Sequence, residues 1–142
     1  AWEAITLLAS AVHTVEANAV GASVEVGDIE KALVVLDVTA SATDAADTLD
    51  VYLDVSWDGG TTWYNAVHFT QQAGNGAAKK ELAVLDGAYS TDPDAVLAIT
   101  ADAGSGVVRQ QLLGPLMRVR STVVRDTGTD ESHTFSVKAY VK

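Results

Sequence analysis

Three histidines, His13, His68 and His133, are the residues of this chain best suited to acid–base or metal chemistry. A zinc centre needs several nitrogen or sulfur ligands at short, characteristic spacings, and the chain contains no cysteine. The three histidines lie far apart in the sequence, and His13 and His133 each fall within strand-like alternation. We interpret all three as structural histidines and expect neither a metal centre nor a cofactor.

A second candidate for chemistry is the acidic segment at 126–131, which gathers three carboxylates around a glycine. Oxygen ligands in a loop are what Ca²⁺ prefers, although the spacing here is not that of an EF-hand. A solvated hairpin turn is the preferred interpretation of this segment, and calcium binding is the alternative.

Nucleophile and phosphate motifs are missing from the sequence. Ser105 lies between two glycines but lacks the G-x-S-x-G pattern of a nucleophile elbow. The glycines and lysine of 74–79 lack the spacing of a phosphate-binding loop, and the Asn-Gly pair there indicates a hairpin turn. We therefore predict that the protein is not an enzyme.

The elements that must position these residues are strands. In residues 49–57, apolar side chains alternate with Asp50, Tyr52, Asp54 and Ser56, which predicts a half-buried antiparallel strand. The segment 32–36 is apolar on both faces, as a central strand would be. Similar patterns predict strands at 5–15, 21–26, 32–40, 49–57, 61–70, 80–85, 107–113, 116–125 and 133–142.

Strands at this spacing, separated by turn-rich segments, predict an all-β fold: an antiparallel β-sandwich of about eight strands, jelly-roll-like or immunoglobulin-like. The length of 142 residues fits a single domain over 1–142. We expect 1–10 to form an N-terminal arm or an edge strand. We expect 86–106 to be a surface excursion, within which 93–99 is either a short helix or a strand.

The net charge of −10 and the pI of about 4.4 disfavour nucleic acid as a direct partner, because phosphate binding needs clustered lysine and arginine. No apolar run approaches the length of about 18 residues that a membrane span requires. The first residues also lack the basic and apolar regions of a signal peptide.

The most specific local pattern is the turn at 56–63, where Asp-Gly-Gly supplies the small and positive-φ residues of a tight hairpin. It fits S-x-D-x-G-x-T-W and so resembles the Asp-box of sialidases, which is a structural and not a catalytic feature. The residues that match are Ser56, Asp58, Gly60, Thr62 and Trp63. We expect Trp57 and Trp63 to pack against each other or the core, with a ligand platform as the alternative.

A wider segment, 52–71 (YLDVSWDGGTTWYNAVHFTQ), is similar to a hairpin that recurs in small all-β virion proteins of tailed phages, and 135–142 is similar to the final strand of such subunits. The size and composition most resemble a capsid decoration (cement) protein. The resemblance implies a non-enzymatic protein of the virion, made in the host cytoplasm. It would bind the major capsid protein on the outer capsid surface as a homotrimer.

Within that interpretation, the candidate inter-subunit contacts are Trp2, Ile5 and Leu7 in the N-terminal segment. Arg118 and Arg120, which share one face of a predicted strand opposite Met117 and Val119, are expected with Arg109 and Arg125 to pair with acidic surface on another subunit. Two other functions stay open: a phage tail or head–tail adaptor subunit, and a carbohydrate-binding module.

Overall fold

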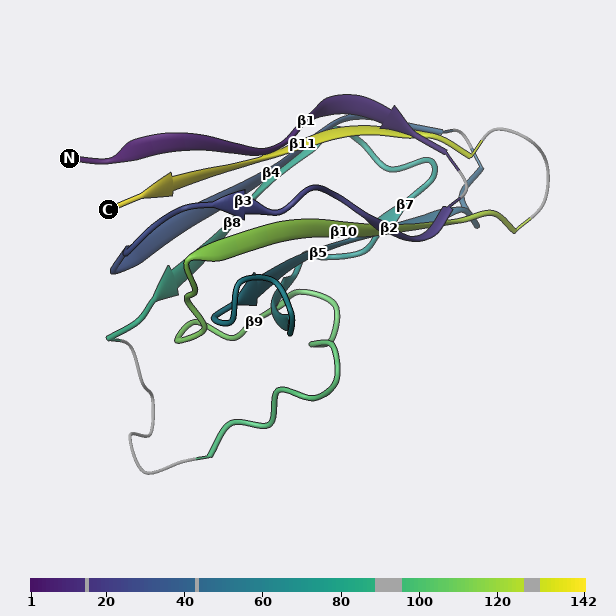
Figure 1. The fold of residues 1–142 in the computed structure, drawn as a ribbon. Helices are drawn as coiled ribbons and strands as arrows, with labels where there is room; N and C mark the ends of the chain where they lie inside the picture. Colours follow the sequence, from purple (N-terminus) through teal and green to yellow (C-terminus); the bar gives the residue numbers. More distant parts are fainter. Residues whose placement is uncertain (15, 43, 89–95, 127–130) are drawn as a thin grey trace.

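The computed structural model describes residues 1–14, 16–42, 44–88, 96–126 and 131–142. These residues form two antiparallel sheets that face each other and contain no helix (Figure 1). The prediction of an all-β antiparallel sandwich is confirmed, with eleven strands when the short ones are included.

The first sheet has four strands in the order β1-β11-β4-β8. It therefore places the first and last strands of the chain side by side. The strands are β1 (Glu3–His13), β11 (His133–Val141), β4 (Lys31–Ser41) and β8 (Lys79–Asp86). β1 lies at one edge of this sheet, and its ladder with β11 is interrupted by register shifts on either side of Leu8.

The second sheet has the order β2-β10-β5-β6-β9, with β3 also paired to β10 and β7 to β5. Its central pair is β10 (Leu116–Val124) and β5 (Thr48–Ser56). The other strands are β2 (Glu16–Val20), β3 (Val24–Glu25), β6 (Tyr64–His68), β7 (Gln72–Ala73) and β9 (Val107–Val108).

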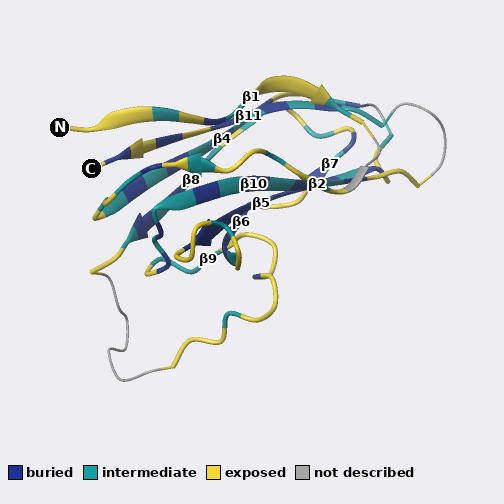
Figure 2. Ribbon diagram, in the orientation of Figure 1, coloured by how far each residue is buried: buried dark blue, intermediate teal, exposed yellow. Residues whose placement is uncertain are grey.

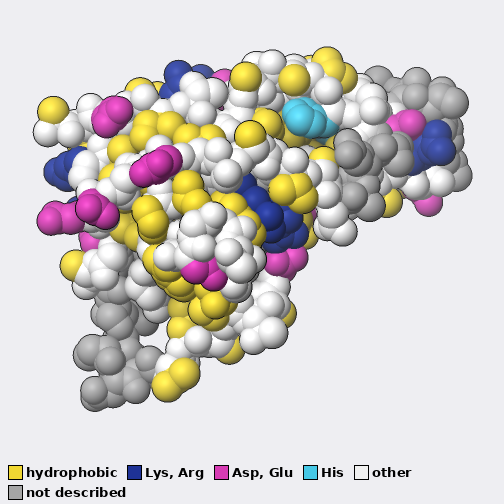
Figure 3. Space-filling model, viewed as in Figure 1, with side chains coloured by type: hydrophobic (Ala, Val, Ile, Leu, Met, Phe, Trp, Pro, Cys, Tyr) yellow, Lys and Arg dark blue, Asp and Glu magenta, His cyan; other side chains and the backbone are white. Residues whose placement is uncertain are grey.

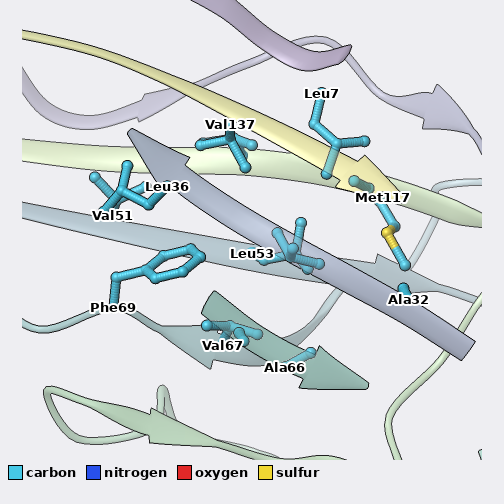
Figure 4. Close-up of a cluster of buried hydrophobic side chains, with 14 of the residues drawn as sticks. Leu7, Ala32, Leu36, Val51, Leu53, Ala66, Val67, Phe69, Met117 and Val137 are labelled. Carbon is cyan, nitrogen blue, oxygen red and sulfur yellow. The ribbon is translucent and has the colours of Figure 1, made fainter. Parts of the chain in front are cut away.

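The core lies between the sheets and is made by the period-two alternation of each strand. In β11, for example, Phe135, Val137 and Ala139 are completely buried, and the residues between them face outward. Figure 4 shows Leu7, Leu36, Val51, Leu53, Met117 and Val137 converging from both sheets. Figure 2 shows the same alternation of buried and less buried positions along the strands.

Several details differ from the sequence predictions. No strand was predicted at Glu16–Val20 or at Gln72–Ala73, and of the strand predicted at 21–26 only Val24–Glu25 is present. The strand predicted at 107–113 contains only Val107 and Val108, and the returning strand of the central hairpin begins at Tyr64 rather than at 61. The returning strand, β6, contains a bulge. Leu53 of β5 lies opposite Val67, and the next residue, Asp54, lies opposite Asn65, so Ala66 is an extra residue without a partner in β5.

The prediction that β5 is half-buried is wrong, because both of its faces are covered. Asp54 and Ser56, on the side predicted to be polar, are 2% and 0% exposed.

The segment that follows β8 was expected to make a surface excursion. Its described part, 96–106, runs along the outer side of the second sheet and leads into β9 (Figure 1). The helix-or-strand alternative at 93–99 falls largely outside the described residues.

Candidate functional site

The hairpin turn between β5 and β6 is closed by side chains of the Asp-box pattern. The buried Ser56 Oγ donates to Asp58 Oδ1 at 2.9 Å and accepts from the Gly60 N–H at 3.0 Å. Asp58 Oδ1 also accepts from the Thr62 N–H at 2.7 Å. The backbone of Thr62, followed by its side chain, is the main cause that holds the pKa of the Asp58 carboxyl below its ordinary value.

Glycine is required in this turn by backbone geometry. Gly59 and Gly60 have φ values of 71° and 90°, a region that residues with a Cβ rarely adopt. Trp63 completes the turn by donating from Nε1 to Gly60 O at 2.9 Å. These contacts join Ser56, Asp58, Gly60, Thr62 and Trp63 within the turn, so the pattern closes the turn as a structural feature.

The two tryptophans beside the turn have different partners. Trp57 is 50% exposed, so the expectation that it packs into the core is wrong, and its ring centroid lies 5.0 Å from that of Tyr64. Trp57 is exposed because β5 ends one residue earlier, at Ser56. Trp63 instead lies under the guanidinium of Arg118, whose Cζ is 4.5 Å from the ring centroid.

The outer face of the second sheet carries a network that we call the polar layer: Asp50, Tyr52 and Asp54 of β5, Asn65 and His68 of β6, and Arg118 and Arg120 of β10. Figure 3 shows Lys and Arg side chains grouped over β10 with Asp and Glu side chains beside them.

The centre of the polar layer is Asp54, whose side chain is 2% exposed. It accepts from Arg120 Nε at 2.7 Å and from Arg118 Nε at 3.1 Å. Arg120 Nη2 also donates to Asp102 Oδ1 at 2.7 Å. Burial lowers the pKa of Arg120, but its hydrogen bonds to Asp54 and Asp102 outweigh burial and leave that pKa above its ordinary value.

The shared face of Arg118 and Arg120 is confirmed, because both contact Asp54 while Met117 and Val119 are buried on the opposite side. Both arginines therefore have an acidic partner inside the chain, which removes the reason to assign them to another subunit. The remaining arginines are also engaged internally. Arg125 pairs with Glu131, and Arg109 donates to the carbonyls of Asn65 and Ala101.

The other half of the polar layer is an aromatic stack. The rings of Tyr52 and His68 lie 4.2 Å apart, and the guanidinium of Arg120 covers the second face of Tyr52 at 4.4 Å. Burial, followed by the charge of Asp50, raises the pKa of the Tyr52 hydroxyl. His68 lies with Nε2 2.7 Å from Asp50 Oδ1 and with Nδ1 2.8 Å from Ala103 O.

The polar layer holds the loop at 101–109 against the sheet. Ala103 is bound on both sides of its backbone, because its N–H donates to Asn65 Oδ1 at 2.9 Å and its carbonyl lies against His68. Asp102 and Ala101 are bound by Arg120 and Arg109. Asn65, His68 and Arg120 of the layer thus fix this loop.

The two histidines of the first sheet lie opposite each other in the pairing of β1 with β11. His133 is completely buried, with Nδ1 2.9 Å from Ser41 Oγ. Burial lowers its pKa, and the nearby charge of Asp47 opposes that shift. His13 stacks on Phe135 with a centroid separation of 4.3 Å. Among the described residues, no three histidine or carboxylate side chains are grouped so that they could hold a metal ion.

The acidic segment considered for calcium falls mainly on 127–130, outside the described residues. Of its described residues, Glu131 pairs with an arginine, since Glu131 Oε1 is 3.2 Å from Arg125 Nη1. The backbone N–H of Asp126 donates to Asp47 Oδ1 at 2.9 Å.

The N-terminal contact residues fall in three different environments. Trp2 is 43% exposed and carries the Lys142 ammonium 4.8 Å from its ring centroid. Ile5 is partly buried against the core. Leu7 is 4% exposed and belongs to the core, so assigning it to an inter-subunit contact was wrong: it lies on the same inward face of β1 as Ile5.

The outer face of the first sheet is apolar at its centre and lysine-rich around it. In the register of the sheet, Tyr140, Leu33 and Val84 form one row, and Lys138, Val35 and Leu82 form the next. We call this the lysine-bearing face. It comprises Trp2, Leu33, Val35, Leu82, Val84 and Tyr140 with Lys31, Lys80, Lys138, Lys142, Asp37 and Asp86.

Sequence reasoning missed Asp54 and Asp102 as partners of the arginines. The signal for Asp54 was present in the alternation of β5, but its partners depend on the pairing of β5 with β10, which a single sequence does not specify.

None of the described residues forms a helix with the length and apolarity needed to cross a bilayer. No protein-family model matches this chain, and no curated protein matches it either.

Proposed function

We propose that this chain is a non-enzymatic structural protein of a tailed-phage virion, a decoration subunit that binds the outside of the capsid as an oligomer. The observation that carries the proposal is the hairpin of β5 and β6. Its sequence is similar to the hairpin of small virion subunits, and its side chains close the turn through Ser56 and Asp58.

The rest of the described chain is compatible with such a role. Arg118 and Arg120 are paired with a carboxylate of the same chain, and the exposed apolar side chains of the four-stranded sheet face outward. A subunit that binds only the assembled shell shifts the equilibrium toward that shell, because ligand binding to one state stabilises it by mass action. A protein that stabilises a capsid in this way needs a surface that binds the shell and does not need a catalytic group.

Cryo-electron microscopy of virions from the phage that encodes the chain tests this function. We expect density for the chain on the outer capsid surface, in contact with the major capsid protein and grouped in threes. Density confined to the tail, or absence of the chain from virions, would contradict the decoration role. Rings of six or twelve copies at the portal would favour the adaptor alternative.

One observation favours a second candidate, a carbohydrate-binding module. Trp57 is half-exposed beside Tyr64, and exposed aromatic rings are stacking platforms for sugars. Saturable binding on a glycan array, lost in Trp57→Ala but kept in Trp2→Ala, would replace the decoration proposal with this one.

A further inference from the structure

We propose that the lysine-bearing face docks onto an apolar surface of another protein that is rimmed by carboxylates. The inference rests on the proposed function and deepens it by assigning which surface of the subunit meets its partner, and with what chemistry.

The apolar centre of the face is exposed to solvent. Leu82 is 60% exposed and Tyr140 37%, although both lie within a regular antiparallel sheet. Leu33, Val35 and Val84 lie between and beside them and are partly exposed. Contiguous apolar patches on a soluble domain mark interaction sites, whereas singly exposed apolar residues do not.

The rim of the face has the opposite charge to the chain as a whole. Four of the five lysines lie on this face, with only two aspartates, in a chain of net charge −10. Lys31 pairs with Asp86, and Lys142 covers Trp2. Lys80 and Lys138 are exposed and have no carboxylate within ion-pair distance among the described residues. These two ammonium groups are available to acidic groups of a partner.

The second sheet shows what a covered outer face looks like in this molecule. Its polar layer is overlaid by the loop at 101–109, and Asp54 beneath that loop is nearly inaccessible. In Figure 1 this loop lies on the far side of the molecule from the four-stranded sheet. Among the described residues, the apolar centre of the lysine-bearing face is therefore exposed, whereas the polar layer of the second sheet is covered by the loop.

A second copy of the chain is a poor occupant. A two-fold contact between two lysine-bearing faces would bring like charges together, which is destabilising at an interface. A contact with the opposite sheet of another copy would meet the loop and the polar layer instead of a flat apolar surface. The partner is therefore a different protein, with an apolar patch between carboxylates.

The experiment uses virions that lack the chain, prepared from a phage with its gene deleted, and purified full-length chain added back. Bound chain is measured by sedimentation over a concentration series at two salt concentrations. We expect Lys138→Glu and Leu82→Ser each to weaken binding at least about tenfold. Both side chains are exposed, so circular dichroism and the thermal midpoint should match the parent protein.

The matched control is Arg125→Glu, which makes the same change in charge at a position 46% exposed outside this face. We expect its binding to stay within about threefold of the parent. If all three variants bind like the parent, the inference is overturned while the decoration function stands. If the parent itself does not bind, the proposed function fails first and the inference with it.

Sedimentation of the chain without virions tests whether a second copy of the chain occupies the lysine-bearing face. If the chain self-associates and Lys138→Glu or Leu82→Ser abolishes that association, the face is occupied by a second copy and the inference is overturned. Self-association that both variants retain supports the inference, because it leaves this face free for the other protein.

Discussion

Arg120 holds Asp54 with two hydrogen bonds, from Nε to Oδ2 at 2.7 Å and from Nη2 to Oδ1 at 3.1 Å. Arg118 adds a third contact to the same carboxylate. One buried carboxylate thus contacts two guanidiniums that lie two residues apart on one strand. Such bidentate, charge-assisted pairs are strong and geometrically specific, and removing the acid leaves both cations poorly compensated.

The first prediction concerns this pair. Asp54→Asn should lower the free energy of unfolding by about 3 kcal/mol, because it breaks a largely buried ion pair while keeping the side-chain volume. Asp102 is the other acidic partner of Arg120, and its side chain is 47% exposed. Asp102→Asn should therefore lower the free energy of unfolding by less than about 1 kcal/mol. Urea unfolding of both variants measures the difference, and equal losses would contradict the central role given to Asp54.

The second prediction concerns the loop at 101–109. His68→Phe keeps a ring that can stack on Tyr52 but loses the contacts with Ala103 O and Asp50. We expect faster amide hydrogen exchange in 101–106, with exchange in β4 and β11 unchanged. Ser136→Ala, on the outer face of the other sheet, is the control and should leave the loop unaffected. Unchanged exchange in the loop would show that His68 does not hold it.

The third prediction is a pH dependence. Burial lowers the pKa of His133 in the folded protein, so the unfolded chain, with a histidine pKa near 6.5, takes up the proton first. The contribution of this residue to stability is therefore complete above about pH 6.5 and is lost as the pH falls toward the folded-state value. Urea unfolding at several pH values should show this loss in the parent and a smaller loss in His133→Gln.

For comparison, His13→Gln should retain the pH dependence that we assign to His133. The same slope in the parent and in His133→Gln would show that another group is responsible.

The fourth prediction tests the hairpin turn. Gly60→Ala should destabilise the fold by about 1–2 kcal/mol, because a φ of 90° is unfavourable for a residue with a Cβ. Gly104→Ala is the control: its φ is not positive, and an added Cβ would meet only the Val107 side chain at 3.8 Å. Thermal unfolding compares them, and equal midpoints would show that the turn tolerates strain at Gly60.

Much of the fold could be predicted from alternation alone. The strands of 49–57 and 133–142 are recognisable because apolar and polar residues alternate along them, and 117–120 shows the same alternation. The turn at 56–63 contains its own geometric signature. The strand predicted at 107–113 was too long, and only Val107–Val108 is a strand, because so short an element carries no period that marks where it ends. Its existence depends on pairing with β6, a long-range contact.

The candidate site was less predictable for a related reason. Asp54 belongs to a polar stripe that is typical of a solvated strand face, yet it is buried, because Arg118, Arg120 and the loop at 101–109 cover it. Leu7 was expected at a contact surface, but it lies on the inward face of β1 and is covered by the second sheet. Strand pairing and sheet packing decide these two cases, and they are properties of the assembled sheets.

The position of β11 between β1 and β4 sets an order of events during synthesis. β4 can pair with β8 while the chain is still growing, but β1 has no partner in its own sheet until the last strand has left the ribosome. Pairing over such sequence separations is slow, because the loop must close before the contacts form. β1 therefore has no strand partner in its sheet until β11 has been made, and the pairing of β11 with both neighbours completes that sheet.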